Sequence, residues 1–302
     1  MTQTAARIIR RSATAPSNLE AMRTVIRREL LTRLLNRSVV VSTVVLGAFA
    51  GLGTGVVGWF LVDRFGITGT LALNTQFLVA TAMISALLAA LIYSSHSLAA
   101  GVVEEKSSRL AEILLTKIGV TPLLTGKLIG VGLVTLGQLM VIGGAALTSF
   151  TVVGGWRVLD VELGTNLLWF LVWFLLGFVS FATLSTLLAS TVSRHEDLGT
   201  ALTPLTVFQL VLWVVALYVV PQYLESTWVQ VLSFVPLFSS YLMPMRFALG
   251  GVHTMEMVLA ALIAAVTVPL LFRFTTIIYR NTALRTGSLV STREPSTSGE
   301  TA

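Results

Sequence analysis

The sequence predicts an all-α polytopic membrane protein, and its composition, its apolar runs and its charge distribution all indicate this class. Hydrophobic residues make up 55% of the 302 residues and charged residues 11%, whereas a soluble domain carries roughly 25% charged residues. A helix crosses the hydrocarbon core of a bilayer with about 20 residues. Six apolar runs reach that length, and the last extends to residue 278 if Arg273 reaches the headgroups. The predicted spans are residues 39–62, 75–95, 128–150, 167–189, 201–220 and 257–272.

The N-terminal residues predict a disordered basic segment, residues 1–17, followed by an interfacial helix over residues 18–38. Ser17 or Asn18 can cap this helix, and its apolar residues recur at helical spacing with arginines around much of the wheel. We expect the helix to lie along the cytoplasmic headgroups before the first span. The first span lacks a cleavage site and is interpreted as a retained signal-anchor helix. The recurring apolar residues are Met22, Ile26, Leu30 and Leu34.

The distribution of lysine and arginine predicts the orientation of the chain. The segments before the first span, between spans two and three, between spans four and five, and after the last span lie on one side of the membrane, and together they carry seventeen of these residues. The segments on the other side carry three. Cytoplasmic segments carry the excess of positive charge. Both termini are therefore predicted to be cytoplasmic in a multi-pass protein of the cell membrane. The net charge of +6 is interpreted as a topology signal, with contact to anionic lipids as an addition, and not as a nucleic-acid footprint.

A short charged helix is predicted over residues 103–116, between the second and third spans. Five charged residues fall within residues 104–112, and Glu105 and Arg109 have the i, i+4 spacing of a helical ion pair. A firm polar helix beside a bilayer is typical of a surface that binds a partner. An ordinary solvated loop helix is the alternative interpretation.

Residues 221–253, between the fifth and sixth spans, combine prolines with aromatic side chains. Prolines break regular helix, and irregular backbone at membrane depth survives where it is buried in protein or faces water. A re-entrant pair of short helices on the outer side is one interpretation, and an interfacial aromatic belt is the other. The prolines are Pro221, Pro236 and Pro244.

The sequence offers no catalytic, metal or cofactor site that we can identify. There are no cysteines, and His96, His195 and His253 stand far apart. Residues 121–127 superficially resemble a phosphate-binding loop but lack its first glycine and the Ser or Thr after Lys127. Glycines at residues 47, 51 and 55 form a small-xxx-small face suited to close helix packing.

Two neighbouring sequence features resemble those of the ABC-2 type permeases. The first is the run Val-Val-Glu-Glu-Lys-Ser-Ser-Arg-Leu-Ala-Glu-Ile-Leu-Leu-Thr at residues 102–116, and the second is the Gly-Lys-x-x-Gly sequence at residues 126–130, where the third span begins. The similarity is greatest to the branch named for the sodium-export permease NatB. Supporting matches are Ser-Arg-His-Glu-Asp at 193–197, Ser-Phe-Val-Pro at 233–236 and Met-Pro-Met-Arg at 243–246. Many NatB-like permeases have a sizeable domain between the first two spans, whereas here about a dozen residues join them. This departure argues against sodium as the substrate.

The resemblance implies the six-helix half-transporter fold of an ABC-2 (type V) exporter over residues 39–280, with residues 281–302 as a cytoplasmic tail. It implies that this chain is a transport subunit and not an enzyme, and that ATP and magnesium bind to a separate ABC ATPase subunit. It also implies dimerisation with a second copy or a homologous permease, among membrane lipids. The residues 103–116 would form the coupling helix, and Pro236, Pro244 and Arg246 an outer gate. The expected ATPase contacts are Glu104, Glu105, Lys106, Arg109, Leu110, Glu112 and Ile113.

An ATP-independent membrane protein, either a secondary transporter or a sensor subunit, is the alternative class. Secondary transporters usually show repeat symmetry, broken helices or buried ionisable groups, and the sequence displays neither repeats nor charged residues inside the first five predicted spans. The sequence does not select a substrate among ions, drugs, lipids and peptides.

Overall fold

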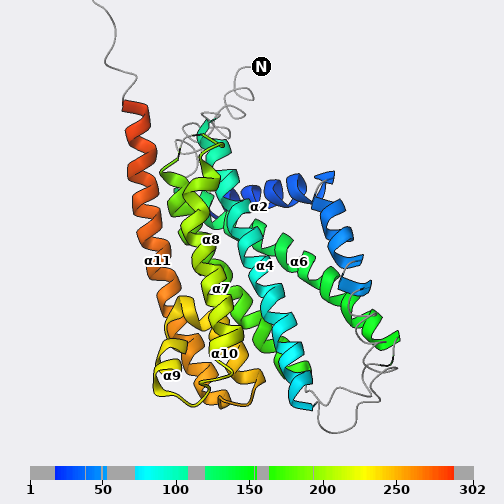
Figure 1. Ribbon diagram of the computed structural model, residues 1–302. Helices are drawn as coiled ribbons and strands as arrows, with labels where there is room; N and C mark the ends of the chain where they lie inside the picture. The colour runs from blue at the N-terminus through cyan, green and yellow to red at the C-terminus, as the bar shows by residue number, and fades with distance from the viewer. Residues whose placement is uncertain are drawn as a thin grey trace, which may run out of the picture.

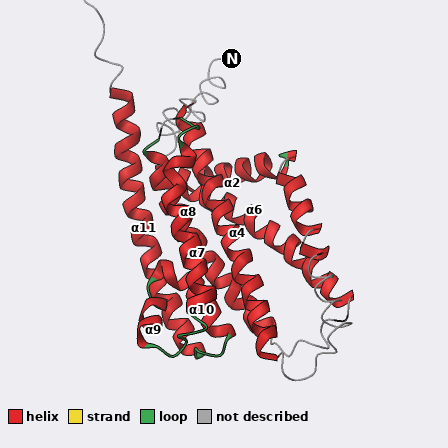
Figure 2. Cartoon of the chain, in the orientation of Figure 1, coloured by secondary structure: helices red, strands yellow, loops and turns green. Residues whose placement is uncertain are grey.

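The computed structural model describes residues 18–37, 39–48, 50–52, 72–107, 120–152, 154, 163–192 and 194–288. Within these ranges every regular element is a helix (Figure 2). The helices are α2 (Asn18–Leu34), α4 (Ala72–Ser107), α6 (Val120–Val152), α7 (Leu163–Ser190), α8 (Leu198–Val214), the π-helix η2 (Val215–Val219), α9 (Thr227–Ser233), α10 (Pro236–Ala248) and α11 (Thr254–Ser288). A further helical stretch, Val39–Leu52, follows α2 after a bend of 61°.

Five described helices are long and apolar enough to cross a membrane, which agrees with the predicted all-α membrane class. The candidate spans are Phe77–Lys106, Thr121–Val152, Gly164–Ser190, Leu198–Val219 and Thr254–Tyr279. A sixth is obtained if α2 and Val39–Leu52 are taken together as one bent span. The first predicted span, residues 39–62, is described only as far as residue 52.

The spans are longer than the apolar runs that predicted them. The predicted second span ended at residue 95, but α4 continues to Ser107, and α6 begins at Val120 rather than at residue 128. Residues 103–107 of the predicted coupling helix are therefore the last turns of α4, while residues 108–119 lie outside the described residues. The length of an apolar run indicates only which residues can lie in the hydrocarbon core. The helix can continue beyond that run when its charged side chains form ion pairs or hydrogen bonds.

The last helix also extends beyond its predicted span. The sixth span was predicted over residues 257–272, or as far as 278 if Arg273 reaches the headgroups, and α11 passes through Pro269 and Arg273 to Ser288. Proline removes one intrahelical hydrogen bond, which membrane helices tolerate when neighbouring groups satisfy the freed carbonyl. The Arg273 side chain is exposed, so its charge does not have to be buried for the helix to continue.

Helix α7 is the centre of the bundle and packs against α4, α8, α10 and α11 (Figure 1). Its aromatic side chains fill the space between these neighbours. Phe174 and Phe178 stack with ring centroids 5.9 Å apart, and Phe181 meets the edge of Tyr241 from α10 at 6.0 Å. Trp173 is completely buried and packs in a cluster with Met257 and other residues of α11.

Helix α8 is held to α4 by side-chain hydrogen bonds along their contact. His96 Nε2 and Thr206 Oγ1 are 3.0 Å apart, and Trp213 Nε1 donates to Ser85 Oγ at 3.1 Å. The buried Gln209 accepts a hydrogen bond from the hydroxyl of Tyr241 at 3.2 Å. These bonds satisfy polar groups that would be costly if left unpaired away from water.

Helix α2 lies across one end of the bundle, where α11 also ends, and we call this the α2 end (Figure 1). Helix α6 leaves the bundle on its way to the opposite end, and Val39–Leu52 lies beside its distal half. Gly47 and Gly51 face Ala145 of α6, and a Cβ atom added at Gly51 would lie only 3.4 Å from the Ala145 carbonyl oxygen. The predicted close packing is thus confirmed for these two glycines, while Gly55 lies outside the described residues.

The proline-rich segment between the fifth and sixth spans contains the two short helices α9 and α10, at the end opposite α2 (Figure 1). Pro236 occupies the first turn of α10, where the missing N–H group costs nothing. Helix α10 packs against α7, α4 and α11, and its residues 239–243 are all buried.

We predict that Trp173→Ala destabilises the protein strongly, because it leaves a large cavity between α7 and α11. The expected loss is about 3–5 kcal/mol, most of it lost packing contacts. Thermal unfolding of the detergent-purified chain, followed by circular dichroism, measures this change. The matched control is Leu175→Ala on the same helix, which should have little effect because Leu175 is 50% exposed. Equal losses in the two variants would contradict the central position of α7.

Candidate functional site

The candidate site is a charged junction at the α2 end, where α2, α4 and α6 meet. Three residues at i, i+4 and i+8 on α4, Ser97, Gly101 and Glu105, lie on one face of that helix. Each contacts a cationic side chain from α2 or α6. We call this set of contacts the α2–α4–α6 junction.

The innermost contact of the junction is an ion pair between Glu105 of α4 and Lys127 of α6. Lys127 Nζ lies 2.7 Å from Glu105 Oε2, and both side chains are buried, at 2% and 5% exposure respectively. Lys127 Nζ also donates to the carbonyl oxygen of Gly101 at 2.9 Å. Removing the Glu105 carboxylate would leave Lys127 buried without its counter-ion. The pair therefore fixes the end of α4 against the beginning of α6.

Helix α2 joins this pair through two arginines. Arg28 Nη1 lies 3.4 Å from Glu105 Oε1, at the half-exposed edge of the junction. Arg33 pairs with Glu29 one turn earlier, at 2.8 Å, and donates hydrogen bonds to the hydroxyl and the carbonyl oxygen of Ser97. Because these contacts lie one turn apart on α2, they hold the helix across the end of α4.

Two glycines let α2 approach α6 closely. A Cβ atom at Gly126 would lie 2.8 Å from Val25 Cβ, and one at Gly130 would lie 2.7 Å from Glu29 Cβ. These distances are shorter than real Cβ contacts, so any side chain at either position forces α2 away. In the Gly-Lys-x-x-Gly sequence, the two glycines thus form a flat surface on which α2 packs, and the buried Lys127 lies between them in the sequence.

Lys106 extends the junction to α7. Its Nζ donates to the carbonyl oxygens of Ser190 and Val192, at 2.8 and 3.3 Å, just where α7 ends. A cation at a helix C-terminus pairs with unsatisfied carbonyls and with the negative end of the helix dipole. An apolar cluster lies alongside, formed by Ala99, Val102, Val103, Leu124, Ala189, Leu198, Leu202 and Tyr279.

The structure separates the residues predicted to contact an ATPase. Glu104 is exposed, Lys106 is half-buried against α7, and Glu105 points into the bundle. Sequence spacing paired Glu105 with Arg109, which lies outside the described residues. Among the described residues, Glu105 pairs with Lys127 and Arg28. The remaining predicted contacts, Arg109, Leu110, Glu112 and Ile113, lie outside the described residues.

Arg246, predicted at an outer gate, is buried at the opposite end of the bundle, with 1% exposure. It donates to Ser233 Oγ at 2.6 Å and to the Gly251 carbonyl oxygen at 3.1 Å, and lies 3.8 Å from Glu256 of α11. Burial lowers the pKa of the Arg246 guanidinium, and the Glu256 carboxylate partly offsets this effect by raising it. Arg246 therefore links α9, α10 and the start of α11.

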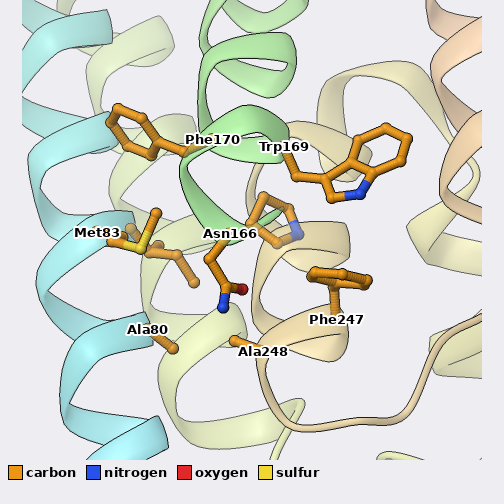
Figure 3. A pocket seen from close by; sticks show the side chains of 9 residues that line it. Ala80, Met83, Asn166, Trp169, Phe170, Phe247 and Ala248 are labelled. Carbon is orange, nitrogen blue, oxygen red and sulfur yellow. The ribbon is translucent and has the colours of Figure 1, made fainter. Parts of the chain in front are cut away.

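Pro244 lines a small hollow between α4, α7 and α10 (Figure 3). Figure 3 shows the Asn166 amide and the rings of Trp169 and Phe247 around the hollow. The centroids of these two rings are 6.2 Å apart. The volume of the hollow, about 20 Å³, has room for about one water molecule. The hollow is too small for a transported substrate.

Among the described residues no three His, Cys, Asp or Glu side chains lie together as metal ligands. The polar groups at the junction are charge pairs and helix-capping contacts, and none is paired as nucleophile and base. This arrangement suits the joining of helices rather than catalysis.

The sequence interpretation missed Arg28, Arg33 and Ser97, and gave Lys127 no partner. A signal was present in the spacing, because Ser97, Gly101 and Glu105 repeat every four residues where the apolar run ends. Only the packing of α4 against α2 and α6 identifies their partners, since these lie far away in the sequence.

We predict that the Glu105–Lys127 pair shows strong energetic coupling in a double-mutant cycle. Glu105→Met should cost about 3–5 kcal/mol, because it leaves the buried Lys127 without its counter-ion, and Lys127→Met should cost less than that, because Arg28 still lies 3.4 Å from Glu105. The double variant should cost less than either single variant, since no buried charge remains. Thermal unfolding in detergent measures all three.

The control for this cycle is Glu196→Met, at an exposed carboxylate between α7 and α8, which should leave stability unchanged. A double variant whose loss equals the sum of the two single losses would show that the pair contributes no coupling.

We also predict that Gly130→Ala loosens α2, because the new methyl group overlaps Glu29. Overpacking of this kind costs about 1–3 kcal/mol, so trypsin should cleave after the arginines of α2 about tenfold faster or more. Gly143→Ala on the same helix is the matched control, because nothing lies within 4 Å of its added Cβ. If both variants are cleaved at the native rate, α2 does not depend on this close approach.

The family of the chain follows from comparison with known proteins. Residues 62–277, well over half of the chain, match the family model described as ABC-2 family transporter protein. No match was found among curated proteins. The matched range contains α4 and α6 with Glu105 and Lys127, and it also contains α7–α10. The chain therefore belongs to the ABC-2 family of transporter proteins, whose members are membrane subunits of ATP-binding cassette transporters.

Proposed function

We propose that this protein is the permease subunit of an ABC exporter whose ATP is hydrolysed by a separate ATPase subunit docked at the α2 end. ABC-2 permeases normally work with an ATP-binding subunit. The observation that carries the proposal is the α2–α4–α6 junction, which joins three helices by buried charges next to the segment expected to contact the ATPase. ATP and magnesium would bind to that subunit.

The predicted coupling segment, residues 103–116, would leave the membrane at the end of α4, and α6 begins at Val120. A displacement of this segment would act on α4 and α6 together, because Glu105 and Lys127 join them. Helix α2 would follow through Arg28 and Arg33. Glu105 serves here as an internal anchor rather than a contact.

We assign the contacts with the ATPase to residues of this segment other than Glu105, which is buried in the bundle. Glu104 is exposed, and Arg109, Leu110, Glu112 and Ile113 follow it in the segment. Lys106 contributes by fixing the end of α7. Charge alternation in this segment favours a firm helix with a charged surface.

The proposal includes a second permease, either another copy or a homologue, with the substrate path between the two. The α2 end would be cytoplasmic, as the lysine and arginine distribution predicts. Helices α9 and α10, with Pro236, Pro244 and Arg246, would form the outer gate. The buried contacts of Arg246 support this assignment because they join α9 and α10 to the start of α11. The NatB-like branch remains a prediction from the sequence.

We predict that an ATPase co-purifies with the tagged full-length chain from native membranes in mild detergent. The double variant Arg109→Glu/Glu112→Arg should lose most of the bound ATPase activity, because it reverses two of the charges on the expected contact surface. Arg194→Glu is the matched control, since it reverses an exposed charge between α7 and α8, and it should retain the ATPase.

Failure of any ATPase to co-purify with the native chain would contradict the proposed function. Full binding by the double variant would contradict the placement of the contact in residues 103–116.

A further inference from the structure

A hollow of about 290 Å³ lies between α2, the Val39–Leu52 helix and the middle of α6. We call it the α2–α6 hollow. Small-molecule pockets begin at roughly 300 Å³, so its size allows a bound molecule. Its walls include Leu34, Val40, Val44, Leu133, Gly137 and Val141.

The walls of the hollow are almost entirely apolar. Two polar side chains reach it, Thr43 and Gln138, and these satisfy each other, because Gln138 Nε2 donates to Thr43 Oγ1 at 2.9 Å. The Thr43 hydroxyl in turn donates to the Val39 carbonyl oxygen at 2.7 Å. Such walls favour a hydrocarbon chain over a polar ligand.

The lining residues Val44 and Val141 are 61% and 52% exposed, and Met140 beside them is 64% exposed. The hollow therefore opens to the outside of the described part of the chain. In a membrane-spanning protein such apolar surface faces acyl chains, so we expect the α2–α6 hollow to open toward the hydrocarbon of the bilayer.

Two arginines lie beside the hollow where α2 crosses the end of the bundle. Arg27 precedes the lining residue Leu30 by three positions on α2, and Arg37 precedes the lining residue Val40 by three positions at the start of the following helix, so both lie close to the lining faces. Both are exposed, and neither forms an ion pair within the part of the chain that the structure describes. Their charges complement a phosphate at headgroup depth.

We propose that the α2–α6 hollow binds an anionic membrane phospholipid, with one acyl chain in the hollow and the headgroup phosphate at Arg27 and Arg37. A phospholipid fits because it combines a hydrocarbon chain with a negative charge at the depth where these two features meet. A net negative headgroup is preferred over a zwitterionic one, because each arginine near the membrane surface attracts anionic lipid. This site is separate from the proposed ATPase contact and does not depend on it.

The test uses a fluorescent label on the full-length chain, which has no native cysteine. Met140→Cys carries bimane beside the hollow, and the protein is placed in phosphatidylcholine nanodiscs containing brominated phosphatidylglycerol or brominated phosphatidylcholine. Bromine quenches the label at short range. We expect half-maximal quenching at about tenfold less phosphatidylglycerol than phosphatidylcholine. A label at Leu262→Cys, on the exposed face of α11, should show no such preference.

Two variants of the Met140-labelled chain examine the acyl chain and the headgroup separately. Gly137→Leu fills the hollow, and Gly143→Leu adds the same side chain to α6 outside the lining; neither new Cβ meets an atom within 4 Å. Arg27→Gln/Arg37→Gln removes the proposed phosphate contacts, and Arg194→Gln/Arg273→Gln removes two other exposed arginines. The first variant of each pair should lose the preference for phosphatidylglycerol, and the second should keep it.

Equal quenching by the two lipids at residue 140 would overturn the proposal, because it would indicate ordinary surrounding lipid. Retention of the preference in Gly137→Leu or in Arg27→Gln/Arg37→Gln would overturn it as well. Absence of quenching by either lipid would also overturn it, by showing that protein covers the hollow, either residues of this chain or a second copy.

Discussion

The buried ion pair between Glu105 and Lys127 is the constraint on which the α2 end depends. Each charge taken from water costs several kcal/mol, and this cost is offset only when the opposite charge is close and well placed. The pair therefore requires the end of α4 to lie directly against the start of α6. This requirement explains why both helices continue beyond their apolar runs, and why the flanking Gly126 and Gly130 leave room for α2. The same geometry places the Glu105 carboxylate within reach of Arg28.

The two ends of the bundle are built from different physical contacts. At the α2 end, cations of three helices contact the carboxylates of Glu29 and Glu105 and several backbone carbonyl oxygens, so helices are joined by charge. At the other end, Arg246 binds a hydroxyl, a carbonyl oxygen and the more distant Glu256. Between them the aromatic side chains of α7 pack without charge. The proposed function, in which force enters at one end and the other end opens, would require a stiff middle of this kind. Helix α6 diverges from this middle and leaves the α2–α6 hollow beside it.

The class of the protein and most of its helices could be predicted from the sequence, because apolar runs of about 20 residues have few alternatives in water or lipid. The ends of the spans could not. A hydropathy run stops at the first charged residue, whereas α4 continues because Lys127, distant in the sequence, compensates Glu105. Sequence spacing could suggest only the local pair with Arg109, which stays a prediction because Arg109 lies outside the described residues, since local pairs are the ones that a helical wheel reveals. The Gly-Lys-x-x-Gly signature was recognised as a family feature, but its physical purpose appears only with α2 packed on it.

The central claim is that charge pairing at the junction holds α2 and α4 as one unit. A distance measurement by electron paramagnetic resonance tests it most directly, with spin labels at the exposed Thr32 of α2 and Leu78 near the far end of α4. About 35 Å of helix separates Leu78 from Gly101, which suits the method. We expect one narrow distance distribution in the native chain and a broad one when Glu105→Gln removes the carboxylate charge. A distribution that stays equally narrow in that variant would show that charge pairing does not hold the two helices together.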